Sequence, residues 1–212
     1  MNVGVLVSGS GTNLQALIDR HQRGDLAPAQ LVVIGANVPD CAALARARQA
    51  ALPTFVVDHR DYPERPAFDR AMVDSLRAHQ VDLVVLAGFN RLLGRELLES
   101  FPGRVINIHP ALLPAFPGVR AQRQAFDAGV KIAGCTIHFV DHGIDTGPII
   151  AQAAVPVNDD DEEEALRLRI LAEEHRLLPA VVRAIAERRV VLEGRRVRVL
   201  GATPGTDPLR SL

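Results

Sequence analysis

The sequence lacks three features that are typical of nucleic-acid-binding, membrane or secreted proteins. Its formal net charge is −1, which argues against a broad basic surface for nucleic acid or for a membrane. It contains no apolar run long enough to cross a bilayer. Its start shows no charged segment followed by an apolar stretch and a small-residue cleavage site. We therefore expect a cytoplasmic protein with no membrane contact and no nucleic-acid partner.

Cysteine is also scarce. The chain contains only Cys41 and Cys135, which lie far apart and form no C-x-x-C spacing. This pattern predicts two reduced thiols rather than a zinc site or a disulfide framework, and we expect no metal. What remains is ordinary: 212 residues with 48% apolar and 23% charged residues are typical of a globular protein with a sizeable core.

Strand and helix patterns alternate along the first half of the chain, which predicts an α/β fold with a mostly parallel central sheet flanked by helices. Two later apolar runs are separated only by a loop, so they should pair antiparallel in the C-terminal half. No linker or internal repeat is visible, so we expect one domain over residues 1–200 and a tail over 201–212. The predicted strands cover residues 2–7, 30–36, 54–57, 81–86, 105–109, 132–140 and 148–157, followed by a small hairpin at 190–200.

A glycine-rich loop follows the first predicted strand. Ser8-Gly9-Ser10-Gly11 interrupts the apolar run, and Thr12 or Asn13 can cap the helix that comes next. Free backbone N–H groups and the helix dipole make such a loop suited to an anion, most often a phosphate. The alternative is a plain turn that binds nothing.

The loop lacks the marks of the common nucleotide sites. A third glycine is absent after Gly11, and the second strand ends at Asn37 rather than at an acidic residue for an adenosine ribose. The Gly-Lys-Ser/Thr ending of a Walker loop is absent too. A single phosphomonoester therefore fits better than NAD, and the predicted phosphate-binding half covers residues 1–100.

The stretch from Arg104 to Gly118 predicts the centre of a catalytic half, residues 101–190. Asn107 and His109 are spaced i and i+2, so a strand sends both side chains to one face, and Pro110 then ends the strand. An amide donor beside a histidine, which changes charge near neutral pH, can stabilise an oxyanion. In the alternative interpretation, Asn107 caps the strand end and His109 is a satisfied polar residue under a proline loop.

Two further segments carry candidate residues. The loop from Asp141 to Gly147 contains glycines that let it bend, and Asp145 beside His109 would favour and orient the imidazolium. A loop aspartate that only makes a local turn is the alternative. The segment Phe89–Leu93, which follows another strand, pairs polar and apolar side chains and can hold a flat, partly apolar ligand.

Four ordered motifs resemble the phosphoribosylglycinamide formyltransferase family over residues 1 to about 190. The motifs are Ser8–Gln15, Ala87–Phe89, Asn107–Pro114 with Pro117-Gly118, and Asp145–Pro148. The resemblance implies a Rossmann-like formyltransferase fold and formyl transfer from 10-formyltetrahydrofolate, the co-substrate, to the amine of glycinamide ribonucleotide (GAR). It implies a role in purine biosynthesis without a metal. The chain would be a monomer or a homodimer.

The resemblance also assigns roles to residues. Asn107, His109 and Asp145 would be catalytic, with the first two donating to the oxyanion and Asp145 keeping His109 charged. The implied GAR-binding residues are Gly11, Thr12, Asn13 and Glu174. The implied folate-binding residues are Arg65, Asn90, Arg91, Leu92, Leu93 and Asn107. The sequence departs from the family pattern at Ala111, at Val119–Gln122 and at Leu178, positions that the resemblance puts around the site and not at its centre.

Three rival functions follow from the same residues. A formyltetrahydrofolate hydrolase carries an additional N-terminal regulatory domain, whereas the first strand here begins at Asn2. A methionyl-tRNA formyltransferase carries a further basic domain, whereas only residues 189–212 follow the last predicted helix. A non-catalytic module would bind a phosphoribosyl ligand without turning over folate.

Overall fold

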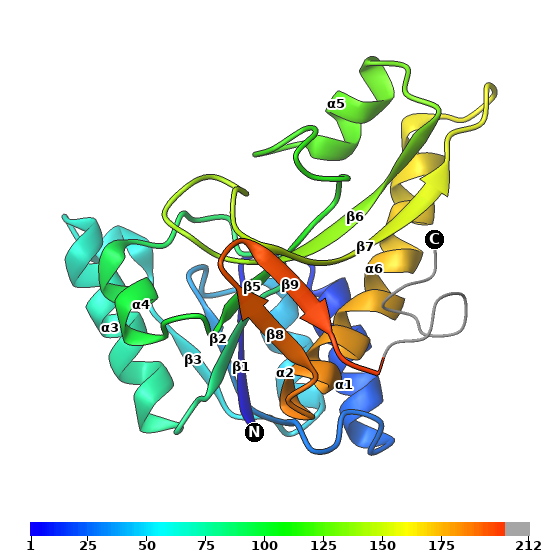
Figure 1. Ribbon diagram of the computed structural model, residues 1–212. Helices are drawn as coiled ribbons and strands as arrows, with labels where there is room; N and C mark the ends of the chain where they lie inside the picture. The colour runs from blue at the N-terminus through cyan, green and yellow to red at the C-terminus, as the bar shows by residue number, and fades with distance from the viewer. Residues whose placement is uncertain (202–212) are drawn as a thin grey trace. The chain divides into compact units, whose positions relative to one another are not determined.

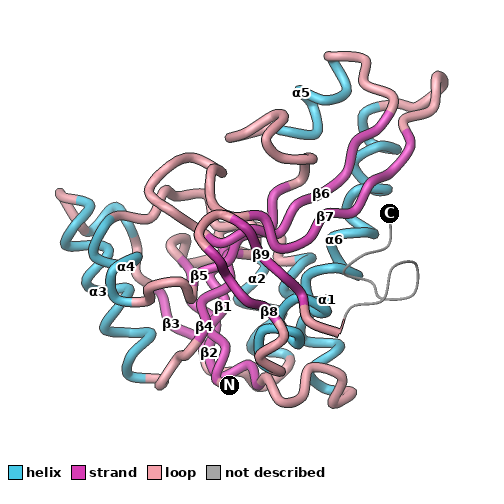
Figure 2. Tube along the Cα trace, viewed as in Figure 1, coloured by secondary structure: helices cyan, strands magenta, loops and turns pink. Residues whose placement is uncertain are grey.

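The computed structural model describes residues 1–201, so nearly all of the predicted tail lies outside the described residues. Seven strands form one mostly parallel sheet, as the sequence predicts (Figures 1 and 2). The strands are β1 (Asn2–Val7), β2 (Gln30–Ala36), β3 (Thr54–Val56), β4 (Leu83–Leu86), β5 (Val105–His109), β6 (Ile132–Phe139) and β7 (Ile149–Pro156). Their order is β3-β2-β1-β4-β5-β6-β7, and β7 runs antiparallel to β6.

Within residues 1–201, six α-helices and one hairpin accompany the sheet. The helices are α1 (Thr12–Gln22), α2 (Ala42–Gln49), α3 (Arg65–Ala78), α4 (Arg95–Ser100), α5 (Ala121–Asp127) and α6 (Glu163–Ala186), with a 3-10 turn at His59–Asp61. Strands β8 (Val190–Glu193) and β9 (Arg196–Val199) form the predicted hairpin. The strand boundaries differ from the predicted ones by at most two residues, as expected where strand ends fray. By their internal contacts the residues form two units, Met1–Asn107 and the part from Ile108 onward.

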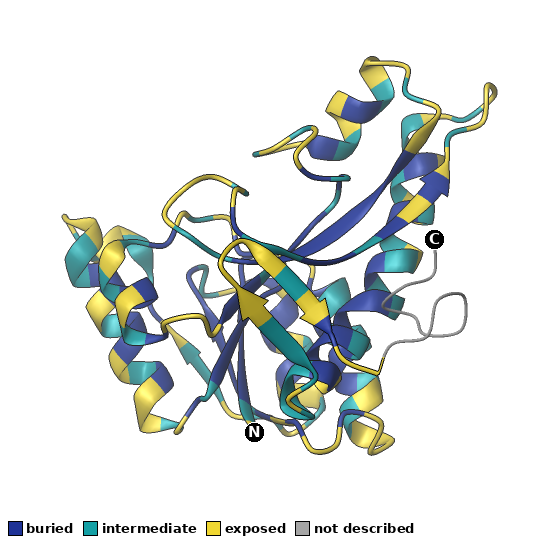
Figure 3. Cartoon of the chain, viewed as in Figure 1, coloured by how far each residue is buried: buried dark blue, intermediate teal, exposed yellow. Residues whose placement is uncertain are grey.

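The first unit is a parallel βα arrangement around β1. This strand pairs in parallel with β2 on one edge and β4 on the other. Val3, Val5, Leu6 and Val7 are fully buried, because helices cover both faces of the strands: α1 and α2 lie on one side, and α3 and α4 on the other (Figures 1 and 3). Burial on both faces explains why these strands are continuous apolar runs rather than alternating ones.

The start of α1 differs from the prediction that Thr12 or Asn13 caps it. Gly11 is the capping residue, with φ 72°, and no side chain makes the cap hydrogen bond. Its carbonyl accepts the first helical hydrogen bond from the N–H of Gln15, 2.9 Å away. Glycine takes this left-handed conformation at little cost, so the helix begins one residue earlier than the side-chain signal indicates.

The second unit packs α6 against the antiparallel pair β6–β7. One face of α6 is buried, and Glu174 lies within that face with 4% of its surface exposed. Strand β9 contacts β7, which anchors the hairpin on the same strand pair. Within residues 1–201, no helix combines the length and the apolar character needed to cross a membrane.

Candidate functional site

His109 ends β5 and is buried, with 5% of its side chain exposed. Its Nε2 lies 2.8 Å from the carbonyl oxygen of Phe116, and its Nδ1 lies 3.3 Å from Oδ2 of Asp145. Phe116 has φ 54°, an unusual backbone conformation for a non-glycine residue. The structure therefore places Asp145 beside His109, where it contacts Nδ1, while Nε2 faces the carbonyl of Phe116.

Asp145 is held from three directions. Its Oδ2 accepts a hydrogen bond from the backbone N–H of Gly118 at 2.8 Å and faces His109. Its Oδ1 lies 3.6 Å from Nε2 of His138. The residue itself has φ 53°, an unusual backbone conformation for a non-glycine residue, and such residues cluster at functional sites because the surrounding structure must hold them.

His138 is a site residue that the sequence analysis missed. It lies near the end of β6, with 2% of its side chain exposed, and its Nδ1 is 2.8 Å from the carbonyl oxygen of Phe139. The only signal in the sequence is one histidine near the end of a mostly apolar strand, IAGCTIHF, and that pattern is equally typical of a core histidine.

Both imidazoles face acceptors on both ring nitrogens. In His109 and in His138, one nitrogen faces a backbone carbonyl oxygen and the other faces the carboxylate of Asp145. A carbonyl and a carboxylate only accept, so each ring satisfies both neighbours when both of its nitrogens carry hydrogen. One half-buried carboxylate thus faces two histidines that are suited to donating hydrogen bonds.

The charge state of Asp145 follows from the same contacts. Burial by itself raises the pKa of this carboxyl group, but the contact with His138, the Gly118 N–H and the charge on His109 together outweigh burial. The net result is a pKa below the usual value, so Asp145 is ionised at neutral pH. An ionised carboxylate beside two imidazoles can hold their N–H groups toward itself and can stabilise a positive charge that forms there.

The loop that follows His109 is tied to β6 and β7. The hydroxyl of Thr136 donates to the carbonyl of Ala111 at 2.6 Å and accepts from the N–H of Leu113 at 3.0 Å. Gln152 on β7 donates to the same hydroxyl and to the carbonyl of Leu113, both at 3.0 Å. These buried bonds fix the start of the proline loop, whose later residues provide the Phe116 carbonyl and the Gly118 N–H.

Replacing Thr136 by valine tests this anchor. Valine keeps the shape but leaves the Ala111 carbonyl and the Leu113 N–H without the hydroxyl, so we expect the free energy of unfolding to fall by about 1–3 kcal/mol. Urea denaturation followed by circular dichroism measures the change. Thr54→Val on the edge strand β3 is the matched control, because no hydrogen bond of its hydroxyl is found among residues 1–201. Equal effects of the two substitutions would contradict the anchor.

Asn107 lies two residues before His109 in β5 and is half-buried. Alternate residues of a strand share one face, so the backbone directs both side chains to the same side. The pair that the sequence predicts is therefore set by the strand itself, whereas the contact of His109 with Asp145 depends on the fold of the second unit.

In the first unit, the glycine loop joins β1 to α1 and is supported by neighbouring strand ends. The hydroxyl of Ser8 donates to Oδ1 of Asn37 at 2.5 Å and accepts from the N–H of Asn90 at 2.8 Å. Nε of Arg46 donates to the carbonyl of Ser10 at 2.9 Å. Ser8, Asn37 and Asn90 follow β1, β2 and β4, so the carboxyl ends of three parallel strands meet here, where open α/β sheets hold ligands.

The helix start beside this loop has the properties of an anion site. Thr12 and Asn13 occupy the first turn of the 11-residue helix α1, and the first N–H groups of a helix have no partner within it. No acidic residue lies in that first turn, so nothing there opposes a negative ligand. The loop can hold a phosphate group through backbone donors.

The predicted folate-binding segment follows β4. The guanidinium of Arg91 lies 5.5 Å from the centre of the Phe68 ring on α3, a cation–π contact. Leu92 is 56% exposed, whereas Leu93 is buried. Arg65 begins α3 and interacts with Asp69, whose pKa is raised because its burial outweighs the charge of Arg65. The segment and Arg65 thus share one side of α3.

The structure groups the predicted residues within each unit. Residues 11–13 and the segment from Asn90 are connected through Ser8, and Arg65 lies near that segment through α3. His109 and Asp145 are in direct contact in the second unit, and Glu174 is buried in α6. Among residues 1–201, no group of three or more histidine, cysteine or acidic side chains is arranged to hold a metal ion.

Comparison with known proteins identifies relatives over most of the chain. The Formyl transferase family profile matches residues 1–182. The phosphoribosylglycinamide formyltransferase of Bacillus subtilis (strain 168) is 43% identical over 183 residues, which cover 85% of this chain and 92% of that protein. The trifunctional purine biosynthetic protein adenosine-3 of Drosophila melanogaster is 47% identical over 178 residues, 84% of this chain but only 13% of that protein's length.

A solved structure extends the similarity to three dimensions. The crystal structure of glycinamide ribonucleotide transformylase 1 from Symbiobacterium toebii superposes with a TM-score of 0.92 at 54% sequence identity. The superposition covers 94% of each chain. The expected fold class, a mostly parallel sheet with an antiparallel strand in the C-terminal half, is confirmed by this match and by the observed strand order.

Proposed function

We propose that this chain, which belongs to the phosphoribosylglycinamide formyltransferase family, transfers the formyl group of 10-formyltetrahydrofolate to the amine of GAR. The products are formylglycinamide ribonucleotide and tetrahydrofolate, in purine biosynthesis. The observation that carries the proposal is the contact of the ionised Asp145 with the buried His109 at the end of β5. Family membership supports transfer to this amine over hydrolysis or simple ligand binding.

His109 and Asn107 act as donors to the oxyanion in this proposal. The amine attacks the formyl carbon, and the formyl oxygen gains negative charge as the tetrahedral intermediate forms. Hydrogen bonds that strengthen at that point lower the barrier, and one such donor is typically worth about 3 kcal/mol. The strand geometry, which directs both side chains to one face, supports this role.

Asp145 keeps His109 charged and handles protons. The attacking amine must lose a proton, and the departing folate nitrogen must gain one. A carboxylate that stays ionised can accept the first proton, directly or through water, while its charge stabilises the imidazolium of His109. The lowered pKa of Asp145 supports the second of these roles, because only an ionised carboxylate stabilises the imidazolium.

The two substrates are assigned to the predicted binding residues. We infer that Gly11, Thr12 and Asn13 hold the phosphate of GAR and that Glu174 accepts hydrogen bonds from its ribose hydroxyls. The carboxylate of Glu174 is of the right type, since it only accepts when ionised. We infer that Asn90, Arg91, Leu92 and Leu93, together with Asn107, hold the folate, and that Arg65 faces its acidic end.

One assay separates the proposal from its rivals. Purified protein receives 10-formyltetrahydrofolate with GAR, with initiator tRNA or with water alone, and the release of tetrahydrofolate is followed. We expect release only with GAR. Release with water alone would indicate the hydrolase, and binding of GAR without any release would indicate a non-catalytic module.

Replacing Gly11 by alanine tests the phosphate loop. The new Cβ would lie 2.6 Å from Cβ and 2.7 Å from Cα of Ala43, and φ 72° is itself unfavourable for alanine. The left-handed conformation alone costs about 1–3 kcal/mol, so we expect lower stability and a raised KM for GAR. The measurements are urea denaturation and steady-state kinetics.

Gly9→Ala is the matched control for the stability measurement. It lies in the same loop, but its new Cβ has nothing within 4 Å. We expect wild-type stability for Gly9→Ala. A Gly11→Ala protein as stable as this control, with an unchanged KM for GAR, would contradict the phosphate-loop assignment.

The remaining inferences concern the chain as a whole. We infer a cytoplasmic enzyme, monomeric or homodimeric, that acts on small molecules rather than on nucleic acid or membranes. We also infer one formyltransferase domain over residues 1–200, with the phosphate-binding half at 1–100 and the catalytic half at 101–190. The near-neutral net charge supports the choice of small-molecule substrates.

A further inference from the structure

The loop from Asp141 to Gly147 carries Asp145 and is closed at its base. Oδ1 of Asp141 accepts hydrogen bonds from the hydroxyl of Thr146 at 2.7 Å and from the N–H of Gly143 at 3.1 Å. These bonds define the outline of the loop. Both bonds join residues of the loop to each other, so other contacts must set the position of the loop against the rest of the second unit. One of them is the bond from the N–H of Gly118 to Asp145.

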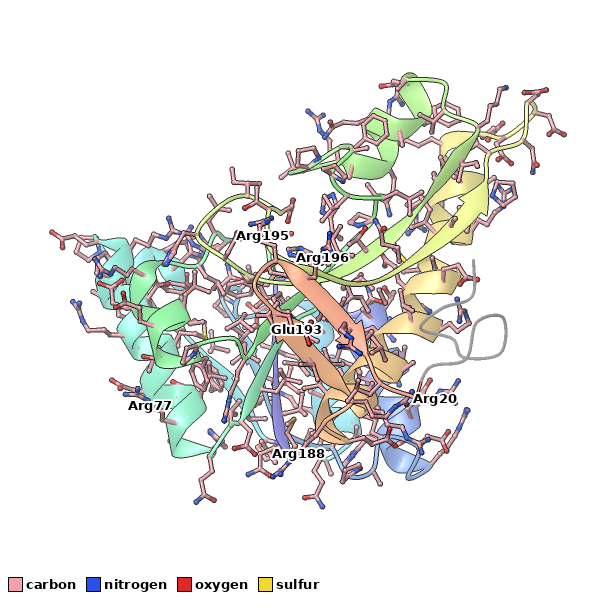
Figure 4. All side chains as sticks on the ribbon, in the orientation of Figure 1. Arg20, Arg77, Arg188, Glu193, Arg195 and Arg196 are labelled. Atoms are coloured by element: carbon pink, nitrogen blue, oxygen red, sulfur yellow. The ribbon has the colours of Figure 1, made fainter. Side chains whose placement is uncertain are left out.

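Arg195 connects this loop to the β8–β9 hairpin. Its Nη2 donates to the carbonyl of Thr146 at 2.5 Å, and its Nη1 lies 3.9 Å from Oδ2 of Asp141. The guanidinium therefore contacts the loop at residues on both sides of Asp145. Figure 4 shows Arg195 at the turn of the hairpin, with Arg196 and Glu193 beside it.

The hairpin is a firm base for this contact. Glu193 pairs with Arg196 across a two-residue turn, and Gly194 has φ 62°, a conformation that such turns require. Strand β9 contacts β7, the strand into which the loop leads. Both partners of the contact are thus anchored on β7. The hairpin also lies after residue 182, where the match to the family profile ends.

Side-chain packing does not fill the space between hairpin and loop. A cavity of about 700 Å³ is lined by Ile144, Asp145 and Pro148 on the loop side and by Arg195, Arg196 and Arg198 on the hairpin side. The position of the loop against the hairpin therefore depends on the Arg195 contacts more than on apolar packing.

We propose that Arg195 is a positioning residue that holds the loop so that the carboxylate of Asp145 meets His109 and His138. The carbonyl that accepts from Arg195 belongs to Thr146, the residue directly after Asp145. The backbone of Asp145 itself is in the left-handed region. Without that restraint, only the Gly118 N–H and the two histidines hold the carboxylate, so we expect Asp145 to spend less time in the geometry that meets the histidines. The proposal rests on the proposed role of Asp145 in formyl transfer.

The expected effect is on rate rather than on stability. The Arg195 side chain is 73% exposed, and exposed ion pairs and hydrogen bonds contribute little to the free energy of unfolding. An exposed contact can bias the loop by no more than its own interaction energy, so we expect kcat to fall about three- to fivefold in Arg195→Ala. The KM values and the melting temperature should stay close to those of the wild type.

Three variants and one double variant test the proposal. Arg195→Lys keeps a positive donor and should recover most of the lost kcat. Arg196→Ala, on the same hairpin, should leave kcat unchanged, because its guanidinium has no partner among residues 1–201. In an Asp145→Asn background, Arg195→Ala should cause no further loss, since the group that it positions is already absent. Hydrogen exchange at residues 141–147 should be faster in Arg195→Ala.

The outcomes separate this inference from the proposed function. A kcat within twofold of the wild type in Arg195→Ala, an equal loss in Arg196→Ala, or an undiminished loss in the Asp145→Asn background would each overturn the positioning role. If the wild type itself transfers no formyl group to GAR, the proposed function fails. The hydrogen-exchange comparison still decides in that case whether Arg195 holds the loop, and unchanged exchange would refute it.

Discussion

Asp145→Asn is expected to lower kcat for formyl transfer by about 10²- to 10⁴-fold, the range typical for loss of an acid–base group, with little change in either KM. Asparagine keeps the size of the side chain and can still accept from the Gly118 N–H, but it carries no charge. His109 and His138 then lose the anion that compensates them, and the amine loses its proton acceptor. Steady-state kinetics with varied GAR and folate measure both parameters, and a near-normal kcat would remove Asp145 from the mechanism.

The pH dependence of stability gives an independent control for this variant. The pKa of Asp145 is lowered in the folded protein, so its contribution to stability is present above the unfolded value, about 4. This contribution is lost as the pH falls through the lowered folded value. We therefore expect the wild type to be more stable than Asp145→Asn at pH 7, with the difference shrinking below about pH 4. Urea denaturation at the two pH values tests the sign.

His109→Ala is expected to lower kcat by about 10²- to 10³-fold, the usual effect of removing one oxyanion donor. The donor acts on charge that appears only as the tetrahedral intermediate forms, so both KM values should change little. Steady-state kinetics and GAR binding by calorimetry separate the two effects. A loss confined to KM would instead indicate that His109 contributes to ground-state binding.

His142→Ala is the matched control for His109→Ala. His142 is exposed in the loop that carries Asp145, whereas His109 is buried at the end of β5. Removing the exposed ring should leave kcat within twofold of the wild type. If both substitutions lowered kcat equally, the effect would come from disturbance of the loop and not from an oxyanion donor.

The sequence by itself determined the elements that depend on neighbouring residues. The strands of both units follow the apolar runs and the positions of glycine and proline, so their predicted boundaries differ from the observed ones by at most two residues. The pairing of Asn107 with His109 on one face of β5 is also local, because the alternation of a strand decides it. The glycine loop before α1 was visible for the same reason, although its capping residue, Gly11, was not.

Only the tertiary structure decided which distant side chains meet. His138 joins the site because β6 ends beside the loop that carries Asp145, and Arg195 reaches that loop because the hairpin is anchored on β7. Neither residue has a distinctive local pattern, since a histidine in an apolar strand and an arginine in a hairpin turn are both common. Contacts between residues far apart in the chain depend on strand pairing and backbone turns such as φ 53° at Asp145, which local propensity disfavours and the surrounding fold imposes.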